Sequence, residues 1–210
     1  MNRPSPRTLA LLLLVAVAIG GAPHSSPAQN AGPPPSPYPG RYPYTAADIH
    51  FISGMIHHHA QAIVMARWAP THDASRSVGI LCERIINAQS DEITLMSNWL
   101  RDRNQPVPEP TAGPMKMTMN GMEHEMLMPG MLSDEQMNQL DAARGGEFDR
   151  LFLRFMIQHH NGAITMVNEL FASPGAGQDE FVFKFASDVY ADQGTEIDRM
   201  QKMYINLPGN

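Results

Sequence analysis

The 210-residue chain has little of what defines several common classes of protein. It contains one cysteine, which excludes an internal disulfide framework and a cysteine-rich zinc module. Its 15 Lys and Arg residues are outnumbered by 21 Asp and Glu residues, so we expect no nucleic-acid binding through phosphate contacts. Charged residues make up only 17% of the chain. Methionine is abundant instead, at 16 residues, and this excess needs a physical explanation.

The mature chain is also expected to lack a membrane span. The N-terminal apolar run, residues 9–19, follows Arg3 and Arg7 and is far shorter than the roughly 20 residues that a spanning helix needs. This pattern predicts a secretory signal peptide over residues 1–28, with an uncleaved N-terminal anchor as the alternative. We therefore expect a periplasmic or secreted protein. The Pro-rich residues 29–43 are expected to form a disordered tether.

Two segments of the chain repeat each other without a gap. Residues 51–65 and 152–166, offset by 101, share Phe, Met, Ile, a His-His pair, Ala-Ile and Met at matching positions. Further on, residues 89–96 and 193–200 share Gln, Glu-Ile and Met. Each half of the chain therefore carries an MxxHH segment followed by a QxxEIxxM segment, which indicates a duplicated structural unit.

The apolar residues of these segments recur with a helical period. Capping-box sequences at Thr45 and Ser133 predict helix starts. The expected helices span about residues 45–69, 74–103, 133–171 (with a break at 145–146) and 178–206. We therefore predict an all-α four-helix bundle over residues 44–207, made of two repeated helical hairpins. Its parts are repeat one (45–103), a methionine-rich crossover (104–132) and repeat two (133–206).

Paired histidines lie on or beside the core-facing stripe of each repeat, and each pair follows a methionine by three and four residues. The candidate ligands are Met55, His58 and His59 in the first half and Met156, His159 and His160 in the second. Residues three or four apart share a helix face and can share one ion. Burying several imidazoles without purpose costs free energy, so we expect metal binding. The alternative is a set of core histidines that are satisfied by neighbouring groups.

The donor types indicate which metal to expect. Thioether plus imidazole, without carboxylate, favours Cu(I), and Ag(I) is a similarly soft ion. Carboxylate-bridged di-iron sites in bundles use Glu-x-x-His motifs, and the sequence contains none, which argues against an iron oxidase. Zinc prefers His, Cys and carboxylate ligands, so His with Asp or Glu partners keeps zinc as an alternative.

The crossover is dense in methionine, with seven in residues 115–131. The Met-x-Met-x-Met spacing suits an extended segment that wraps a soft ion, and Pro114, Gly121, Pro129 and Gly130 discourage a packed helix. The alternatives are a flexible hydrophobic linker and an adaptable apolar docking surface. The candidate ligands here are Met115, Met117, Met119, Met122, His124, Met126 and Met128.

Further methionines and polar residues recur at matched positions of the two repeats. Met65, Met166, Met96 and Met200 are expected to be core filler or parts of separate soft-ion sites. His58 and Met65 are seven residues apart, about 10 Å along a helix, and are not expected to ligate one ion.

The second helix of each repeat places polar residues within its apolar stripe. Gln89 and Gln193 are expected to hydrogen-bond the second nitrogen of a ligating histidine, with helix-to-helix bonding as the alternative. Glu92 and Glu196 either orient a histidine in the same way or bind an arginine of a partner helix.

Three remaining residues carry weaker signals. His50 and His57 are expected on the outer face, as solvated side chains or as a weak divalent-metal site. Cys82 falls on an inner stripe and is expected to be a buried, inert thiol, with a Cu(I) ligand as the alternative.

The segment Met128–Val167 resembles a bacterial family catalogued as domain of unknown function 305. The resemblance covers roughly residues 45–206, and it rests on the MPGM segment and on the F-x-x-x-M-I-x-H-H-x-x-A-I-x-M helix, which is doubled here. It implies a ferritin-like four-helix bundle, and some exported members are implicated in periplasmic copper binding and resistance. By this resemblance the ligands are among the paired histidines, the methionines before them and the crossover methionines. His57 departs from the pattern by making a triple histidine.

The sequence as a whole therefore predicts an exported protein that sequesters, buffers or passes on Cu(I), without catalysing a reaction. Its expected partners are Cu(I) or Ag(I) ions and, where the ion is passed on, another copper-handling protein. Two alternatives come from other classes: a redox enzyme on a ferritin-like scaffold, and a helical interaction module with structural Met and His.

Overall fold

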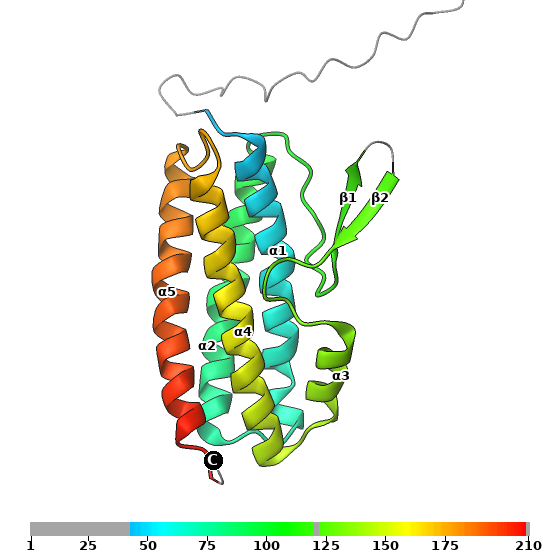
Figure 1. Cartoon of the computed structure of the whole chain (residues 1–210), viewed down its shortest axis with the longest axis vertical. Coiled ribbons are helices and arrows are strands. Elements are labelled where there is room, and N and C mark those ends of the chain that lie inside the picture. Colours follow the sequence, from blue (N-terminus) through cyan, green and yellow to red (C-terminus); the bar gives the residue numbers. More distant parts are fainter. Residues whose placement is uncertain (1–42, 120–121, 209–210) are drawn as a thin grey trace, which may run out of the picture. The chain divides into compact units, whose positions relative to one another are not determined.

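The computed structural model describes residues 43–119 and 122–208. Over these residues the chain forms five α-helices, one 3₁₀ turn and one β-hairpin (Figure 1). The predicted signal peptide and all but the last residue of the predicted tether lie outside the described residues. Among the described helices, none combines the length with the hydrophobicity that a transmembrane span requires.

Four long helices form the bundle, arranged as two hairpins. They are α1 (Ala46–Arg67), α2 (Arg76–Arg101), α4 (Gly145–Ala172) and α5 (Glu180–Ile205). The helix α1 packs along α2, α4 packs along α5, and the hairpins meet through α1 and α4, which run antiparallel (Figure 1). A 3₁₀ turn, Ala69–Thr71, lies in the short connection between α1 and α2. The predicted four-helix bundle is confirmed, and its helices end within two residues of the expected positions.

Helix starts follow the expected capping residues. The backbone N–H of Asp48 donates to Thr45 Oγ1, and the N–H of Thr45 donates to the Asp48 carboxylate at 2.6 Å, which completes the capping box of α1. Ser133 begins the short helix α3 (Asp134–Ala142) with the same arrangement. Gly145 then adopts φ +58°, a conformation that suits glycine, at the start of α4. A break between two helices is therefore present, but it falls at residues 143–144, and the paired glycines begin α4.

The crossover contains a β-hairpin that the sequence analysis did not predict. Strands β1 (Met115–Met119) and β2 (Met122–Met126) pair antiparallel, with Met115 opposite Met126 at the base. Alternate residues of a strand share a face, so the Met-x-Met-x-Met spacing is the pattern of a strand rather than of a loop. Of the predicted ligands here, the side chains of Met117, Met119 and His124 lie outside the described residues.

Two apolar clusters fill the bundle, one toward its upper end and one toward its lower end in the view of Figure 1. The upper cluster includes Phe51, Met55, Met96, Met128, Met166 and Phe185. The lower cluster includes Met65, Leu81, Phe152, Met156, Ile197 and Met200. Along α1 and α4, buried histidines separate the residues of one cluster from those of the other. The bundle therefore has a polar layer between two apolar halves.

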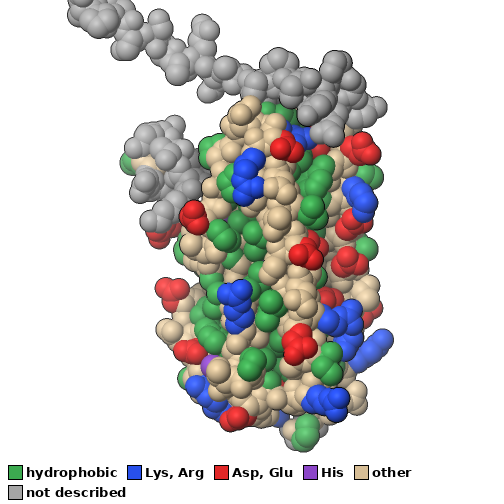
Figure 2. Space-filling model, turned by 180° about the vertical axis from the view of Figure 1, so that it is seen from behind, with side chains coloured by type: hydrophobic (Ala, Val, Ile, Leu, Met, Phe, Trp, Pro, Cys, Tyr) green, Lys and Arg blue, Asp and Glu red, His purple; other side chains and the backbone are tan. Residues whose placement is uncertain are grey.

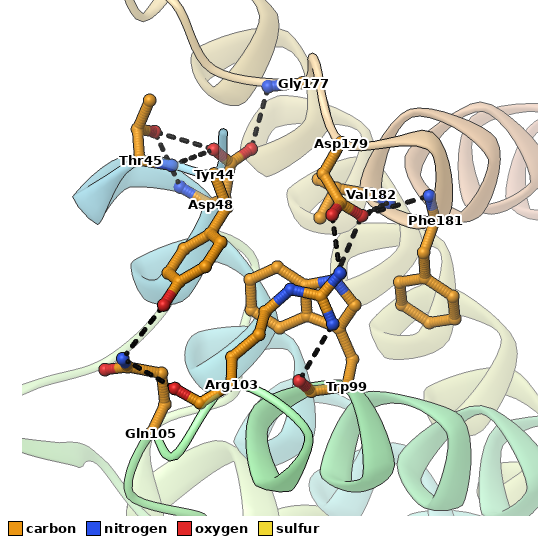
Figure 3. A network of polar contacts seen from close by, with 10 residues as sticks. All are labelled: Tyr44, Thr45, Asp48, Trp99, Arg103, Gln105, Gly177, Asp179, Phe181 and Val182. Atoms are coloured by element: carbon orange, nitrogen blue, oxygen red, sulfur yellow. Dashed lines mark hydrogen bonds and ion pairs between the residues drawn. The ribbon is translucent and has the colours of Figure 1, made fainter. Parts of the chain in front are cut away.

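A buried ion pair ties the two hairpins together at the upper end (Figure 3). Arg103, just after α2, lies 2.5 Å from Asp179 Oδ2, and Trp99 Nε1 donates to Asp179 Oδ1 at 3.0 Å. Asp179 also caps α5 by accepting from the N–H groups of Phe181 and Val182. Burial by itself would raise the pKa of Asp179, but the hydrogen bonds from Trp99 and Arg103 outweigh it and lower the pKa. This carboxylate therefore joins the end of α2 to the start of α5.

Candidate metal centre

Four buried histidines lie between the upper and lower clusters. His58 and His59 on α1, and His159 and His160 on α4, are all completely buried. The face shown in Figure 2 accordingly exposes almost no histidine. The rings of His58 and His159 lie against each other, with centroids 3.8 Å apart and planes inclined at 39°. The repeat therefore brings both predicted histidine pairs into one centre, which we call the imidazole layer.

Most ring nitrogens of the imidazole layer have no hydrogen-bond partner. Six of the eight form no hydrogen bond: both nitrogens of His59 and His159, and Nδ1 of His58 and His160. Of these six, only His59 Nε2 has a carboxylate beside it, at 2.7 Å. Of the other two, His58 Nε2 lies 3.1 Å from the carbonyl oxygen of Pro129, and His160 Nε2 lies 2.7 Å from a glutamate. A buried polar group without a partner costs about 1–3 kcal/mol. Folding thus concentrates unsatisfied ring nitrogens in a buried interior, where a bound metal ion would satisfy the unprotonated nitrogen of a neutral ring.

Each hairpin supplies one glutamate to the imidazole layer. Glu92 Oε2 of α2 lies 2.7 Å from His59 Nε2, without the alignment of a hydrogen bond, and Glu196 Oε2 of α5 bonds His160 Nε2 at the same distance. Glu92 and Glu196 are matched positions of the repeat, so the centre has approximate two-fold symmetry. A carboxylate against one ring nitrogen fixes the orientation of the imidazole and increases the basicity of its other nitrogen. Both glutamates thus contact a histidine, and their role in orienting metal ligands stays a prediction.

The two glutamines expected to bond the imidazoles do not do so. Gln89 and Gln193 are buried, but their side-chain oxygens Oε1 have no hydrogen-bond partner. Glu92 and Glu196, about one helical turn further along α2 and α5, contact the histidines instead. Two amide oxygens therefore remain as additional unsatisfied acceptors in the interior.

Burial keeps the central imidazole pair neutral. Desolvation lowers the pKa of His58 and His159 well below the ordinary value of 6.5, and repulsion from the neighbouring histidines lowers it further. Neutral imidazole is the form whose ring nitrogen can bind a metal ion. The pair is therefore held at neutral pH in its ligating state.

Thioethers flank the imidazole layer on both sides. Met55 belongs to the upper cluster and Met156 to the lower cluster, and both side chains are completely buried. The two methionines lie on opposite sides of the layer because α1 and α4 run antiparallel (Figure 1). The other predicted helix methionines divide in the same way: Met96 and Met166 lie in the upper cluster, and Met65 and Met200 in the lower.

The MPGM turn (Met128–Met131) covers the imidazole layer from one side. Its Pro129 carbonyl oxygen contacts His58 on α1 and packs against Gly162 on α4. A Cβ at Gly162 would lie 2.0 Å from that oxygen, so only glycine admits the turn at this distance. The turn is thus fixed to both central helices, and it places Met128 and Met131 in the upper cluster.

Two residues that hold this segment were missed by the sequence analysis. Gln61 on α1 donates to the carbonyl of Leu132 at 3.0 Å and accepts from its N–H at 2.7 Å. Gln158 on α4 donates to the carbonyl of Gly130 at 3.3 Å. Gln61 aligns with Gly162 in the repeat, and Gln158 aligns with His57. The sequence therefore contained a signal for these residues, because the two repeats differ at the positions against which the crossover packs.

The expectation that His57 lies on the outer face is wrong. His57 is 7% exposed, and its Nδ1 lies 3.2 Å from the carbonyl oxygen of Thr111. The crossover covers this face of α1, and helical periodicity alone carries no information about that contact. His50 is exposed as expected. Cys82 is buried, and burial raises its pKa to about 12, which agrees with an inert thiol.

Within residues 43–119 and 122–208, no group of three or more His, Cys, Asp or Glu side chains is placed to hold a metal ion. A closed zinc cage of these ligand types is therefore not formed among the described side chains. The donors that the fold does bring together are imidazoles in the layer and thioethers on either side of it.

The fold and this centre define a class: helical-bundle proteins whose interior is lined with imidazole and thioether donors. The chain belongs to the family described as domain of unknown function (DUF305), whose model matches residues 48–204. The resemblance seen in the sequence is therefore confirmed. No curated protein matches the chain.

Solved structures of this family are similar to the chain. A DUF305 protein from Streptomyces coelicolor, described as secreted, is 26% identical over 75% of this chain and 91% of that one, with a TM-score of 0.62. A DUF305 fragment from Deinococcus radiodurans is 27% identical over 79% and 99%, with a TM-score of 0.65. CopM in its Cu(II)-bound form is 29% identical over 76% and 96%, with a TM-score of 0.58. CopM has also been solved in Cu(I)-bound and Ag-bound forms.

Proposed function

We propose that this protein is exported and binds Cu(I), which it sequesters, buffers or passes on, and that it catalyses no reaction. The observation that carries the proposal is the set of six ring nitrogens that form no hydrogen bond in the completely buried imidazole layer. Structural histidines are normally hydrogen-bonded when buried, as His72 is here through its contact with Asp141 at 2.9 Å. In the imidazole layer, by contrast, histidines of both repeats have ring nitrogens without a hydrogen bond.

The chemistry of the donors favours a soft monovalent ion. Neutral imidazoles and the thioethers of Met55 and Met156 carry no charge, so they suit Cu(I) or Ag(I) better than a hard divalent ion. The glutamates stand behind His59 and His160 and orient them. Binding of Cu(I) and Ag by CopM, a relative of similar fold, supports this assignment.

A redox enzyme on the same scaffold is a second candidate, because Glu92 and Glu196 bring carboxylates to the histidines at matched positions. The sequence lacks the Glu-x-x-His motifs of carboxylate-bridged di-iron bundles. Oxygen uptake with Fe(II) or Cu(I) as the reductant separates the two candidates. Turnover above the rate of the free ion would favour the enzyme.

The test of Cu(I) binding is a titration against a chromogenic chelator that competes for the ion. The native protein is expected to withdraw Cu(I) stoichiometrically, and His58→Phe with His159→Phe is expected to weaken binding at least tenfold. The matched control is His57→Gln, which removes a neighbouring buried imidazole and introduces the residue found at the aligned position 158. Failure of the native protein to compete at micromolar concentration would overturn the proposal.

A second variant removes donors without touching the imidazoles. Met55→Leu with Met156→Leu conserves side-chain volume, so the fold is expected to persist, with circular dichroism as the check. Weaker Cu(I) binding in this variant would assign the flanking thioethers to the site. Unchanged binding would restrict the ligands to the imidazole layer.

Export has its own test. The predicted signal peptide implies that the protein recovered from the cell envelope or medium begins after residue 28. Mass spectrometry of the purified chain would show this N-terminus, and a chain recovered only from the cytoplasm with Met1 retained would contradict export.

A further inference from the structure

A surface pocket of about 320 Å³ opens beside the upper cluster. Its walls come from the upper ends of α1 and α4 and from the segment that links β2 to the MPGM turn. The donor atoms along its lining belong to His50, Met126, Met128, Met166 and Glu169. Outside the imidazole layer, this pocket therefore gathers three thioethers and one imidazole in a space open to solvent.

The donors of the pocket are graded from the surface inward. His50 is exposed and Met126 is 42% exposed, whereas Met128 and Met166 are only 3% and 5% exposed. A solvated ion can reach the outer pair directly, and the inner pair offers a drier environment. An ion that enters from solvent would therefore contact the exposed donors before the buried ones.

The helix α1 leaves room for the inner thioethers. A Cβ at Gly54 would lie 2.6 Å from Met128 Sδ and 3.3 Å from the methyl carbon of Met166. Any larger residue would displace the sulfur of Met128 from this position. The absence of a side chain at Gly54 therefore provides the space in which these two thioethers lie together.

The pocket borders the imidazole layer at Pro129. Pro129 lines the pocket, and its carbonyl oxygen lies 3.1 Å from His58 Nε2. Met55 follows Gly54 directly and is part of the same upper cluster as Met128 and Met166. The pocket floor therefore belongs to the same thioether-containing cluster that lies next to the imidazole layer on α1.

We propose that this pocket is a second soft-metal site, which takes Cu(I) or Ag(I) from solution and passes it to the imidazole layer. His50 and Met126 make the first contacts, and Met128 and Met166 hold the ion at the floor. Thioethers and neutral imidazole match a soft monovalent cation, and stepwise exchange between such ligands moves it inward without a change of oxidation state. Glu169 adds a negative charge to the lining, which attracts cations. The transfer step rests on the proposed function, whereas binding in the pocket does not.

The experiment is an Ag(I) titration of the mature full-length protein, followed by calorimetry and by NMR of ¹³C-labelled methionine methyl groups. We expect the first additions of Ag(I) to shift the methyl signals of Met128 and Met166. The variant His50→Gln with Met126→Leu is expected to lose one equivalent of Ag(I), or to bind it at least tenfold more weakly, and to fill the remaining site more slowly. Both residues are solvent-accessible, so the fold should tolerate the change.

The matched control is Met122→Leu, which removes a thioether that is 61% exposed on the same strand but does not line the pocket. It should bind as the native protein does. Equal stoichiometry, affinity and filling rate in the His50 and Met126 double variant would overturn the proposal. An equal loss in the Met122 control would also overturn it, because it would assign the effect to exposed thioethers in general.

The variant His58→Phe with His159→Phe separates this proposal from the proposed function. If its methionine methyl groups still shift with Ag(I), the pocket binds by itself, whatever the outcome at the imidazole layer. If it loses ions while the His50 and Met126 double variant loses none, the imidazole layer stands and the pocket does not.

Discussion

The imidazole rings of His58 and His159 lie with their centroids 3.8 Å apart, although 101 residues separate them in the chain. Each belongs to the first helix of its hairpin, and these two helices form the most extensive contact between the hairpins. The duplication thus places equivalent residues against each other at the centre of the bundle. The two histidine pairs, one in each repeat, therefore form a single buried cluster of ring nitrogens.

Acid should destabilise the metal-free protein. The pKa values of His58 and His159 are lowered by burial in the folded state, whereas the unfolded chain keeps values near 6.5. Below about pH 6.5 the unfolded chain binds protons that the folded protein does not, so the free energy of unfolding falls as pH falls. Between pH 7 and pH 5.5 we expect a loss of about 2 kcal/mol. Urea unfolding after chelator treatment measures it.

The control for this pH effect is the variant His58→Phe with His159→Phe. It has neither titrating ring, so its free energy of unfolding should depend much less on pH over the same range. An identical slope in the variant would assign the acid sensitivity to other groups.

The glutamates should tune metal affinity more than stability. Glu92→Gln or Glu196→Gln keeps the size of the side chain but removes the carboxylate against His59 or His160. We expect Cu(I) affinity to fall by about 10-fold to 100-fold, the usual effect of losing a carboxylate behind a ligating histidine. Competition with a chromogenic chelator measures the change. Glu83→Gln, an exposed change on the same helix α2, should leave affinity unaltered.

The contact between the MPGM turn and α4 should not tolerate a methyl group. Gly162→Ala puts a Cβ 2.0 Å from the Pro129 carbonyl oxygen, far inside van der Waals contact, so the turn must move away from His58. We expect destabilisation of about 1–3 kcal/mol, as for other overpacked sites, together with a changed Met128 environment. Gly194→Ala in α5, where a Cβ meets nothing within 4 Å, should instead stabilise the protein by about 0.5–1 kcal/mol. Thermal unfolding of both variants tests this, and equal shifts would contradict it.

The ion pair at the upper end should contribute strongly to stability. Asp179→Ala removes the cap of α5 and leaves the Arg103 guanidinium buried without its carboxylate. Breaking a buried pair in this way costs about 3–5 kcal/mol. Asp188→Asn breaks the exposed pair with Lys184, which is worth less than about 1 kcal/mol. Chemical denaturation compares the two, and similar losses would show that the Asp179 pair is effectively solvated.

Local sequence patterns predicted the helices and their starts well. Thr45 and Ser133 cap helices because their hydroxyls bond a backbone N–H only three residues away, and that contact is visible in the sequence. The histidine pairs were also found from spacing alone, since i, i+3 and i, i+4 positions share a helix face whatever lies opposite.

Contacts between distant segments were predicted less well. The burial of His57 depends on Thr111. Which of Gln89 and Glu92 contacts His59 depends on how α2 is shifted along its axis relative to α1. The pocket that includes His50 requires the crossover to return across α1 and α4. None of these contacts is local, so neither periodicity nor spacing encodes them.

By itself, then, the amino-acid order determined the duplicated helices, the set of sulfur and imidazole donors and the position of each donor along its own helix. These properties depend on neighbours within about one helical turn. Only the tertiary structure decided which donors meet. The antiparallel packing of α1 against α4 joined His58 to His159, and the glycine at position 162 let the MPGM turn approach closely enough to cover them. Those pairings follow from the packing of surfaces far apart in the chain, which is a property of the whole fold.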